Sequence, residues 1–281
     1  MSKNSSYAQK KRKAFGQHFL IDESIIQKIV KETENQLKES NALHLLEIGP
    51  GAGAITHPLI HLLKEQKKKI KMSVVEKDDF IANKWKEQWI ETDSPTLIHS
   101  DFLKLEPQEF TLNEKTIAVS NLPYSVGTAI VQKLIDTPWI HSMVLMFQKE
   151  VCQRIYARPG TKHRGSLSLF IQNEWDATPL ISVPPRAFKP PPKVDSEVIL
   201  LTRRGIPHIP IVTQSEAYQK EWEGLLKSSF QFKRKTLKNN LNKHHKWKQA
   251  FENSGLSDQC RAEQLTWEDW SKLVSHGMTS E

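Results

Sequence analysis

Cysteine is scarce in this sequence, and long apolar runs are missing from it. The 281 residues include two cysteines, Cys152 and Cys260, and neither stands in a CxxC or CxxH spacing. This usage argues against a disulfide scaffold or a zinc site and fits a reducing compartment. No apolar run approaches the roughly 18 residues that a membrane span requires. We therefore expect neither a bound metal nor a membrane partner.

The N-terminal region also lacks the apolar stretch of a secretory signal. Residues 10–13 are all basic, and the absence of acids around them leaves a transit peptide open as an alternative. The motif at 15–20 indicates instead that this arm is used in the working protein. A cytoplasmic location is the better prediction.

Acidic residues are outnumbered, with 32 Asp and Glu against 40 Lys and Arg, which gives a formal net charge of +8. Such a protein favours polyanions, either nucleic acid or an anionic membrane surface. An ordinary basic enzyme with a solvated surface fits the charge equally well.

Short apolar runs alternate with amphipathic stretches over the first 150 residues. Asp22 is placed to cap an early helix that has Ile25 and Ile29 on one face. Five later segments predict buried strands, at 43–48, 70–77, 96–101, 116–122 and 140–148. Helical patterns such as 79–90 and 126–136 separate these strands. The alternation predicts an α/β fold with a parallel sheet covered on both faces.

The pattern changes in the second half of the chain. Strand-like segments at 177–183 and 197–202 enclose a proline-rich loop at 183–193, and 205–213 has the composition of a linker. Residues 214–281 contain amphipathic helical stretches and no convincing strand. We predict two domains, 1–205 and 206–281, of which the second is small and all-helical.

A glycine-rich turn, LLEIGPGAG at 45–53, follows the first of the five strands. Gly49 and Gly51 allow a sharp turn and a close approach of the backbone to a ligand. With Ala54, the same residues satisfy the dinucleotide pattern G-x-G-x-x-[GA], and Glu76 stands about where a ribose-binding acid belongs. The glycines alone leave the ligand ambiguous.

The acid inside the strand, Glu47, favours S-adenosylmethionine over a dinucleotide. A dinucleotide brings its pyrophosphate to the helix N-terminus, where a nearby carboxylate is unfavourable. S-adenosylmethionine carries a sulfonium and an ammonium, which an acid attracts. Glu47 either holds amides of the turn or faces the methionine end of the ligand, and the sequence leaves both open.

Two further acids follow successive strands. Glu76 can accept both ribose hydroxyls through its two oxygens, and Asp101 is placed to accept from the adenine amine of the cofactor. One such acid is more often a helix cap than a ligand. Three acids at the carboxyl ends of successive strands favour a ligand site, because open parallel sheets bind ligands at that edge.

The tetrapeptide NLPY, residues 121–124, follows the fourth strand. The exocyclic amine of adenine is a poor nucleophile because its lone pair is delocalised into the ring. The Asn121 side-chain oxygen and the Leu122 carbonyl could accept its two hydrogens, and Pro123 keeps Leu122 extended. Tyr124 offers a flat face for the target base. In isolation this string is a simple turn, but after this strand it predicts methyl transfer to adenine by positioning, without a metal.

At this point the chain resembles the ribosomal RNA adenine dimethyltransferase family, and most closely its bacterial small-subunit, 16S rRNA members. The matching segments run in order from residue 15 to about 241. They are FGQHFLID (15–22), LEIGPGAGAIT (46–56), NLPY, FQKEVCQRIYARPG (147–160), VPPRAFKPPPKVDSEV (183–198) and FQFKRKTLKNNL (230–241). Within them, PPKVDS and KRKTLKNNL are more specific to the family than the glycine motif.

The resemblance implies a Rossmann-like S-adenosylmethionine-dependent methyltransferase sheet with a small helical C-terminal domain. It implies dimethylation of N6 on two adjacent adenosines near the 3′ end of 16S rRNA, within an immature small ribosomal subunit whose biogenesis the enzyme serves. We expect a monomer. The implied cofactor pocket comprises His18, Leu20, Gly49, Gly51, Glu76, Asp101 and Asn121. Phe188 would stack on the target base opposite Tyr124, with core packing as the alternative.

Three positions depart from the family pattern. His18 stands where many members have Asn, and Lys77 stands where the family often has an aliphatic residue, so that the cofactor site is less typical there. RGSLS at 164–168 replaces a more usual aromatic-glycine segment, which puts nearby RNA contacts in doubt.

A basic cluster opens the C-terminal helical region, and no acid intervenes between Glu223 and Glu252. A solvated helix face is the usual explanation of such a run, but the absence of acids favours a polyanion. The residues expected to contact RNA phosphates are Lys233, Arg234, Lys235 and Lys238.

Other functions remain open at this stage. They are a large-subunit rRNA dimethylase, a DNA adenine methylase, a non-catalytic assembly factor or mitochondrial transcription cofactor, and, more distantly, a nicotinamide-dependent dehydrogenase. The PPKVDS and KRKTLKNNL strings argue against the first two, and the intact Glu76, Asp101 and NLPY argue against lost chemistry.

Overall fold

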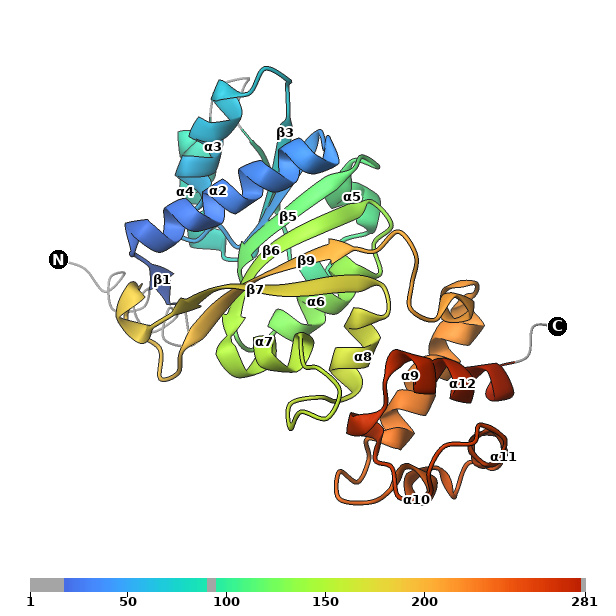
Figure 1. Ribbon diagram of the computed structural model, residues 1–281. Helices are drawn as coiled ribbons and strands as arrows, with labels where there is room; N and C mark the ends of the chain where they lie inside the picture. The colour runs from blue at the N-terminus through green and yellow to red at the C-terminus, as the bar shows by residue number, and fades with distance from the viewer. Residues whose placement is uncertain (1–17, 90–94, 279–281) are drawn as a thin grey trace. The chain divides into compact units, whose positions relative to one another are not determined.

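The computed structural model describes residues 18–89 and 95–278 (Figure 1). The basic residues 10–13 and the start of the motif at 15–22 lie outside these ranges. The chain divides into two compact units. The first holds the described residues up to Cys152 together with Thr178–Thr202, and the second holds Gln153–Ala177 and the described residues from Arg203 onward.

A seven-stranded sheet forms the frame of the first unit, in the order β4-β3-β2-β5-β6-β9-β7. Its strands are β2 (His44–Ile48), β3 (Lys71–Glu76), β4 (Thr96–His99), β5 (Thr116–Asn121), β6 (Ile140–Gln148), β7 (Trp175–Val183) and β9 (Ser196–Arg203). The strands from β2 to β6 pair in parallel, and β9 runs antiparallel to β6. The five strands expected from the first half of the chain are thus confirmed, as are the two late ones.

The strand order reverses between β2 and β5. From β2 the chain proceeds to β3 and β4 on one side, and then returns to β5 and β6 on the other side. All five residues of β2 are buried, as expected of a central strand covered on both faces. The reversal leaves a crevice at the carboxyl ends of β2 and β5, where open α/β sheets bind ligands.

Helices follow the strands of this unit. They are α2 (Glu23–Ser40), α3 (Thr56–Glu65), α4 (Asp79–Gln88), α5 (Pro107–Thr111), α6 (Gly127–Ile135) and the short 3-10 helix η1 (Phe102–Lys104). Of these, α2, α3, α4 and α6 are the ones that the sequence predicts. Four elements have no counterpart among the predicted ones: α5, η1, a further helix α7 (Lys149–Ile155) and the 3-10 helix η2 (Pro185–Ala187).

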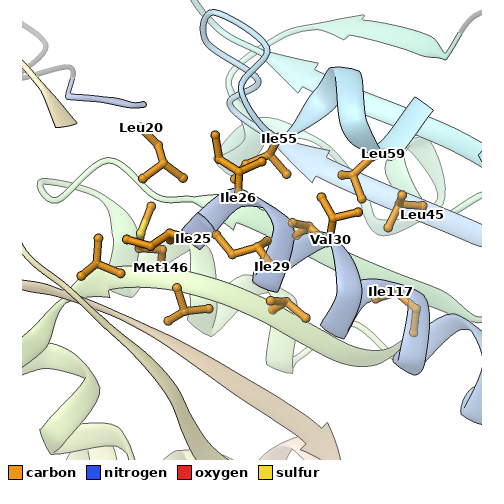
Figure 2. Packing of buried hydrophobic residues seen from close by; sticks show 14 of the residues in the cluster. Leu20, Ile25, Ile26, Ile29, Val30, Leu45, Ile55, Leu59, Ile117 and Met146 are labelled. Carbon is orange, nitrogen blue, oxygen red and sulfur yellow. The ribbon is translucent and has the colours of Figure 1, made fainter. Parts of the chain in front are cut away.

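Helix α2 begins where Asp22 caps it. The Asp22 carboxylate accepts from the backbone N–H of Ser24 at 3.0 Å and of Ile25 at 3.3 Å. Ile25 and Ile29 then belong to the core cluster of this unit. Figure 2 shows the isoleucines of α2 among side chains from the strands, including Leu45 and Ile117. Helix α2 is therefore attached to the sheet by its apolar face.

A second, two-stranded sheet joins distant parts of the chain. Strand β1 (Phe19–Leu20) pairs antiparallel with β8 (Phe188–Lys189), which lies within the proline-rich loop. The Ile21 N–H donates to the Ala187 carbonyl at 2.8 Å, and His18 Nδ1 lies 2.8 Å from the Pro190 carbonyl. The loop expected at 183–193 thus holds the start of the described chain.

The second unit is helical apart from the strand residues at its boundaries. It contains α8 (Ser166–Gln172), η3 (Pro210–Thr213), α9 (Glu216–Ser229), α10 (Leu237–Leu241), α11 (His245–Asn253), η4 (Ala262–Gln264) and α12 (Trp267–Gly277). Trp222 and Trp270 meet edge to face in its core, with ring centroids 5.6 Å apart. The expectation of a linker at 205–213 is wrong, because Ile209 and Val212 are buried in this core.

No helix of the described residues is long and apolar enough to cross a membrane.

Candidate active site

A cavity of about 300 Å³ lies at the carboxyl edge of the sheet, at the reversal between β2 and β5. Four segments line it: residues 18–20, the glycine turn after β2, the end of β3, and residues 121–126 after β5. Of the expected cofactor residues, the structure brings together His18, Leu20, Gly49, Gly51, Glu76 and Asn121.

The glycine turn forms one wall of the cavity. Gly49 and Gly53 adopt φ angles of 70° and 90°, a region that favours glycine. A Cβ on Gly53 would lie 2.7 Å from the His57 ring and 2.8 Å from Trp85, whereas a Cβ on Gly49 would meet nothing within 4 Å. Gly53 is therefore required for packing behind the turn, and Gly49 leaves space on the cavity side.

Glu47 brings a buried carboxylate to the same wall. Its side chain is 2% exposed, and Oε1 accepts from the Thr56 hydroxyl at 3.0 Å. Among the described residues, Oε2 has no hydrogen-bond partner. Burial raises the pKa of Glu47 to about 8, and the nearby charge of Glu76 contributes to this rise. The sequence left two roles open for Glu47. Among the described residues no amide of the turn donates to its carboxylate, and its role toward the methionine end of the ligand stays a prediction.

Glu76 ends β3 and is 6% exposed. Burial raises its pKa above the usual range, while hydrogen bonds from the backbone N–H groups of Asp78, Lys77 and Gly51 oppose the rise. The bond from Asp78 to Oε1 measures 2.7 Å. Glu76 is therefore fixed between the end of its own strand and the glycine turn.

The two carboxylates fit the chemistry of S-adenosylmethionine. Each has a raised pKa, so the cavity destabilises negative charge and would gain from a positively charged ligand. Oε2 of Glu47, which has no hydrogen-bond partner among the described residues, could accept an ammonium N–H or face a sulfonium. A pyrophosphate in the same place would add further negative charge, so the dinucleotide alternative is disfavoured.

The residues of NLPY continue from β5 into the cavity. The Leu122 N–H donates to the Met146 carbonyl at 3.1 Å, which extends the β5–β6 pairing by one step. The Asn121 amide nitrogen donates to the His18 carbonyl at 3.3 Å. Because the nitrogen is used in this way, the Asn121 side-chain oxygen is directed elsewhere and can accept from a substrate amine.

Tyr124, the last residue of NLPY, also lines the cavity, and its hydroxyl group is hydrogen-bonded. The Tyr124 hydroxyl lies 2.6 Å from the Ser196 hydroxyl, and burial raises the pKa of Tyr124. The His18 ring centroid is 5.8 Å from the Tyr124 ring, at a tilt of 34°. The ring is thus held at the cavity wall by its polar end, and its stacking on a base stays a prediction.

A family model described as ribosomal RNA adenine dimethylase matches residues 8–276. The chain belongs to the ribosomal RNA adenine dimethylase family. Membership confirms the expected class of enzyme, an rRNA adenine dimethyltransferase that uses S-adenosylmethionine.

Curated relatives of this dimethylase carry the name ribosomal RNA small subunit methyltransferase A. The protein from Clostridium botulinum (strain Kyoto / Type A2) is 36% identical over 276 residues, which cover 96% of this chain and 94% of the relative. The protein from Enterococcus faecalis is 34% identical over 276 residues, covering 93% and 88% respectively.

Solved structures agree with the expected methyltransferase fold. A dimethyladenosine transferase from Plasmodium falciparum has a TM-score of 0.69 at 24% identity, covering 92% of this chain and 96% of that chain. The 23S rRNA methyltransferase ErmE has a TM-score of 0.67 at 24% identity, covering 92% and 99%.

Asp101 is not among the residues that line the dimethylase cavity, although it contacts one of them. It follows β4 and caps η1, with Oδ1 accepting from the Leu103 N–H at 3.1 Å. Its Oδ2 pairs with the Lys77 ammonium at 2.7 Å, which lowers the pKa of Asp101. Capping, the alternative that the sequence made less favourable, accounts for this geometry. Lys77, the departure noted above, lines the cavity and connects Asp101 to its edge.

Phe188 also lies outside the set of cavity-lining residues. Its ring is 3% exposed and belongs to the core cluster, where β8 pairs with β1. Core packing explains its position in the described structure. Its stacking on a base stays a prediction.

Several residues of the site could not be found from the sequence. Thr56 and Ser196 hold Glu47 and Tyr124 through hydroxyl groups, and a lone Thr or Ser carries no signal of such a role. Across the described parts of the chain, no group of three or more His, Cys, Asp or Glu side chains is placed to hold a metal ion.

The four basic residues expected to contact RNA belong to the second unit. Lys233, Arg234 and Lys235 are exposed in the turn before α10, and no described acid forms an ion pair with them. Lys238 differs, because its ammonium lies 2.6 Å from the Asp258 carboxylate. Three of the four are therefore free of a carboxylate partner among the described residues.

Proposed function

We propose that this family member transfers methyl groups from S-adenosylmethionine to N6 of two adjacent adenosines near the 3′ end of 16S rRNA. We propose further that it acts as a cytoplasmic monomer on an immature small ribosomal subunit. The observation that supports the proposal is that Asn121 and the rest of NLPY line a cavity that also contains two buried carboxylates. The small-subunit name of the relatives supports the choice of RNA.

The cofactor supplies a methyl group activated by a sulfonium. Glu47 lines the cavity, and its buried Oε2 has no hydrogen-bond partner among the described residues. The positive charge at the methionine end would favour the ionised form of Glu47 over the protonated one and would then be attracted by it. Glu76 would accept the ribose hydroxyls. Its hydrogen bonds from the turn keep the carboxylate oriented, so little ordering is left for the moment of binding.

The substrate amine would be held by Asn121 and Leu122. The Asn121 oxygen and the Leu122 carbonyl accept its two hydrogens, so that the nitrogen becomes more tetrahedral and points its lone pair at the methyl group. Tyr124 would stack on the base. Because the sulfonium is a good leaving group, alignment of the reacting atoms is the main contribution of the protein.

Two roles depend on further assumptions. Asp101 would accept from the adenine amine of the cofactor through Oδ2, which it would share with Lys77. Phe188 would stack on the target base only if its ring leaves the core. In its described position the ring instead supports the β1–β8 pair that carries His18 and Leu20 to the cavity.

The proposal is tested by incubating the protein and labelled S-adenosylmethionine with under-methylated small subunits and mapping the labelled nucleosides. We expect label in dimethyladenosine at two adjacent positions near the 3′ end of 16S rRNA. Asn121→Ala should lower the rate roughly 100-fold or more while leaving subunit binding nearly intact. Small subunits left without dimethyladenosine at these two positions, or a near-normal rate for Asn121→Ala, would contradict the proposal.

A further inference from the structure

An exposed aromatic ring stands among the cations of the second unit. Phe232 is 48% exposed, and it directly precedes Lys233, Arg234 and Lys235. Phe230, two residues earlier, instead packs on the core and stacks with Trp270 at 6.2 Å. The two phenylalanines of this segment therefore have different environments, and only Phe230 is explained by the core.

The backbone at Phe232 is held in place. Asn240, which is 6% exposed, accepts from the Phe232 N–H at 3.1 Å and donates to the Phe232 carbonyl at 3.2 Å. The Lys235 N–H donates to the same carbonyl at 3.0 Å, which closes the turn. A ring presented from a fixed turn loses little conformational freedom when it meets a partner.

The surroundings of the ring are cationic. The Lys235 ammonium lies 4.4 Å from the centroid of the Phe232 ring, a cation–π distance. Since the sequence has no acid between Glu223 and Glu252, the turn carries positive charge that no neighbour in sequence offsets. A phosphate backbone satisfies such cations, and an unpaired base satisfies an exposed ring.

We propose that Phe232 stacks on an unpaired base of the RNA substrate while Lys233, Arg234 and Lys235 contact the adjacent phosphates. This inference rests on the proposed function, because it requires an RNA substrate. It adds a base-stacking residue to a surface that would otherwise contact phosphates alone. A protein partner fits less well, because one ring among three cations offers it no contiguous apolar patch.

Stacking and phosphate contacts respond differently to salt. Each phosphate contact changes the slope of log affinity against log salt, by about 0.7 for single strands and about 0.9 for duplexes. Loss of stacking releases no counterions, so it lowers the affinity equally at every salt concentration. Alanine in place of a stacking aromatic weakens binding by about 5- to 150-fold per base.

The experiment measures binding to under-methylated small subunits over a range of salt concentrations. We expect Phe232→Ala to weaken binding by about 5-fold or more with an unchanged slope, and Phe232→Trp to retain the wild-type affinity. Lys233→Ala should instead lower the slope by about 0.7 to 0.9. Ile206→Ala is the matched control: Ile206 is 74% exposed in the same unit, and we expect no effect of its removal.

A second readout identifies the partner of the ring. Acylation of RNA 2′-hydroxyls reports nucleotide flexibility, so the base that stacks on Phe232 should be protected by wild type and by Phe232→Trp, and less so by Phe232→Ala. Wild-type affinity for Phe232→Ala would overturn the inference while leaving the proposed function intact. Weaker binding with an unchanged acylation pattern would also overturn it, since the partner would then be a protein. A wild-type protein that neither binds nor methylates the subunits would overturn both.

Discussion

The buried carboxyl group of Glu47 affects the stability of the protein as well as the chemistry of the cavity. Burial raises its pKa from 4.5 to about 8, so between these values the folded chain holds a proton that the unfolded chain has released. The free energy of unfolding should therefore fall as pH rises from about 4.5 to about 8. The loss should be on the order of a few kcal/mol.

Urea unfolding at pH 5 and at pH 8.5 measures this effect, with Glu47→Gln as the matched variant. Glutamine keeps an oxygen for the Thr56 hydroxyl but cannot ionise. We expect the variant to lose less stability than wild type over this interval. The same pH dependence in both proteins would mean that Glu47 is already charged in the folded protein.

Glu76 should determine affinity for S-adenosylmethionine more than it determines stability. Glu76→Ala removes the proposed acceptor of both ribose hydroxyls, and loss of a hydrogen bond to a charged group costs about 1.5 to 3 kcal/mol. That corresponds to a weakening of roughly 10- to 150-fold. Calorimetric titration with S-adenosylmethionine checks the prediction. Glu39→Ala, at an exposed position of α2, serves as the control.

At the scale of elements, the packing of α2 against the sheet should contribute to the free energy of unfolding. Ile29 is 1% exposed in the core cluster, whereas its neighbour Lys28 is exposed. Ile29→Ala should lower the free energy of unfolding by about 2 to 5 kcal/mol, because it removes buried methyl groups and leaves a cavity. Lys28→Ala should change it by less than about 0.5 kcal/mol. Equal effects in urea unfolding would show that the isoleucine face of α2 is not a packing surface.

Elements could be predicted from the sequence where a local pattern determines them. The apolar run of β2 and the Asp22 cap of α2 are such cases. Strands β1 and β8 have two residues each, too few for any periodicity, and their pairing joins segments 169 residues apart. The linker composition of 205–213 was misleading because Ile209 and Val212 are spaced to enter a core that other helices supply.

In the candidate site, too, the residues that a local pattern positions could be predicted, and the others could not. Glu76 and Asn121 are the last residues of β3 and β5, so their position in the chain places them at the cavity. Asp101 lies two residues beyond the end of β4, and this short extension allows it to cap η1 instead of facing the cavity. The strand that holds Phe188 could not be predicted, because its partner residue is Leu20, which is distant from it in the sequence.

At the scale of the whole molecule, the four basic residues before and within α10 should control the salt dependence of RNA binding. Changing Lys233, Arg234, Lys235 and Lys238 together to Ala should flatten the slope of log affinity against log salt by about three units. Lys238→Ala alone should contribute less than any of the others, because Asp258 already neutralises it. Binding of free S-adenosylmethionine should be unchanged. Salt titration with under-methylated small subunits measures the slopes, and equal slopes would mean that these side chains only face water.

The β1–β8 pair has a consequence for the order in which the protein is made. A nascent chain that has emerged as far as residue 150 already holds the glycine turn, Glu76 and NLPY. His18 and Ile21 still lack their acceptors at Pro190 and Ala187, which are synthesised about 40 residues later. The part of the cavity wall formed by residues 18–20 can therefore be held in place only after residue 190 has been synthesised. Cofactor binding by ribosome-bound chains of increasing length would report when this wall of the cavity forms.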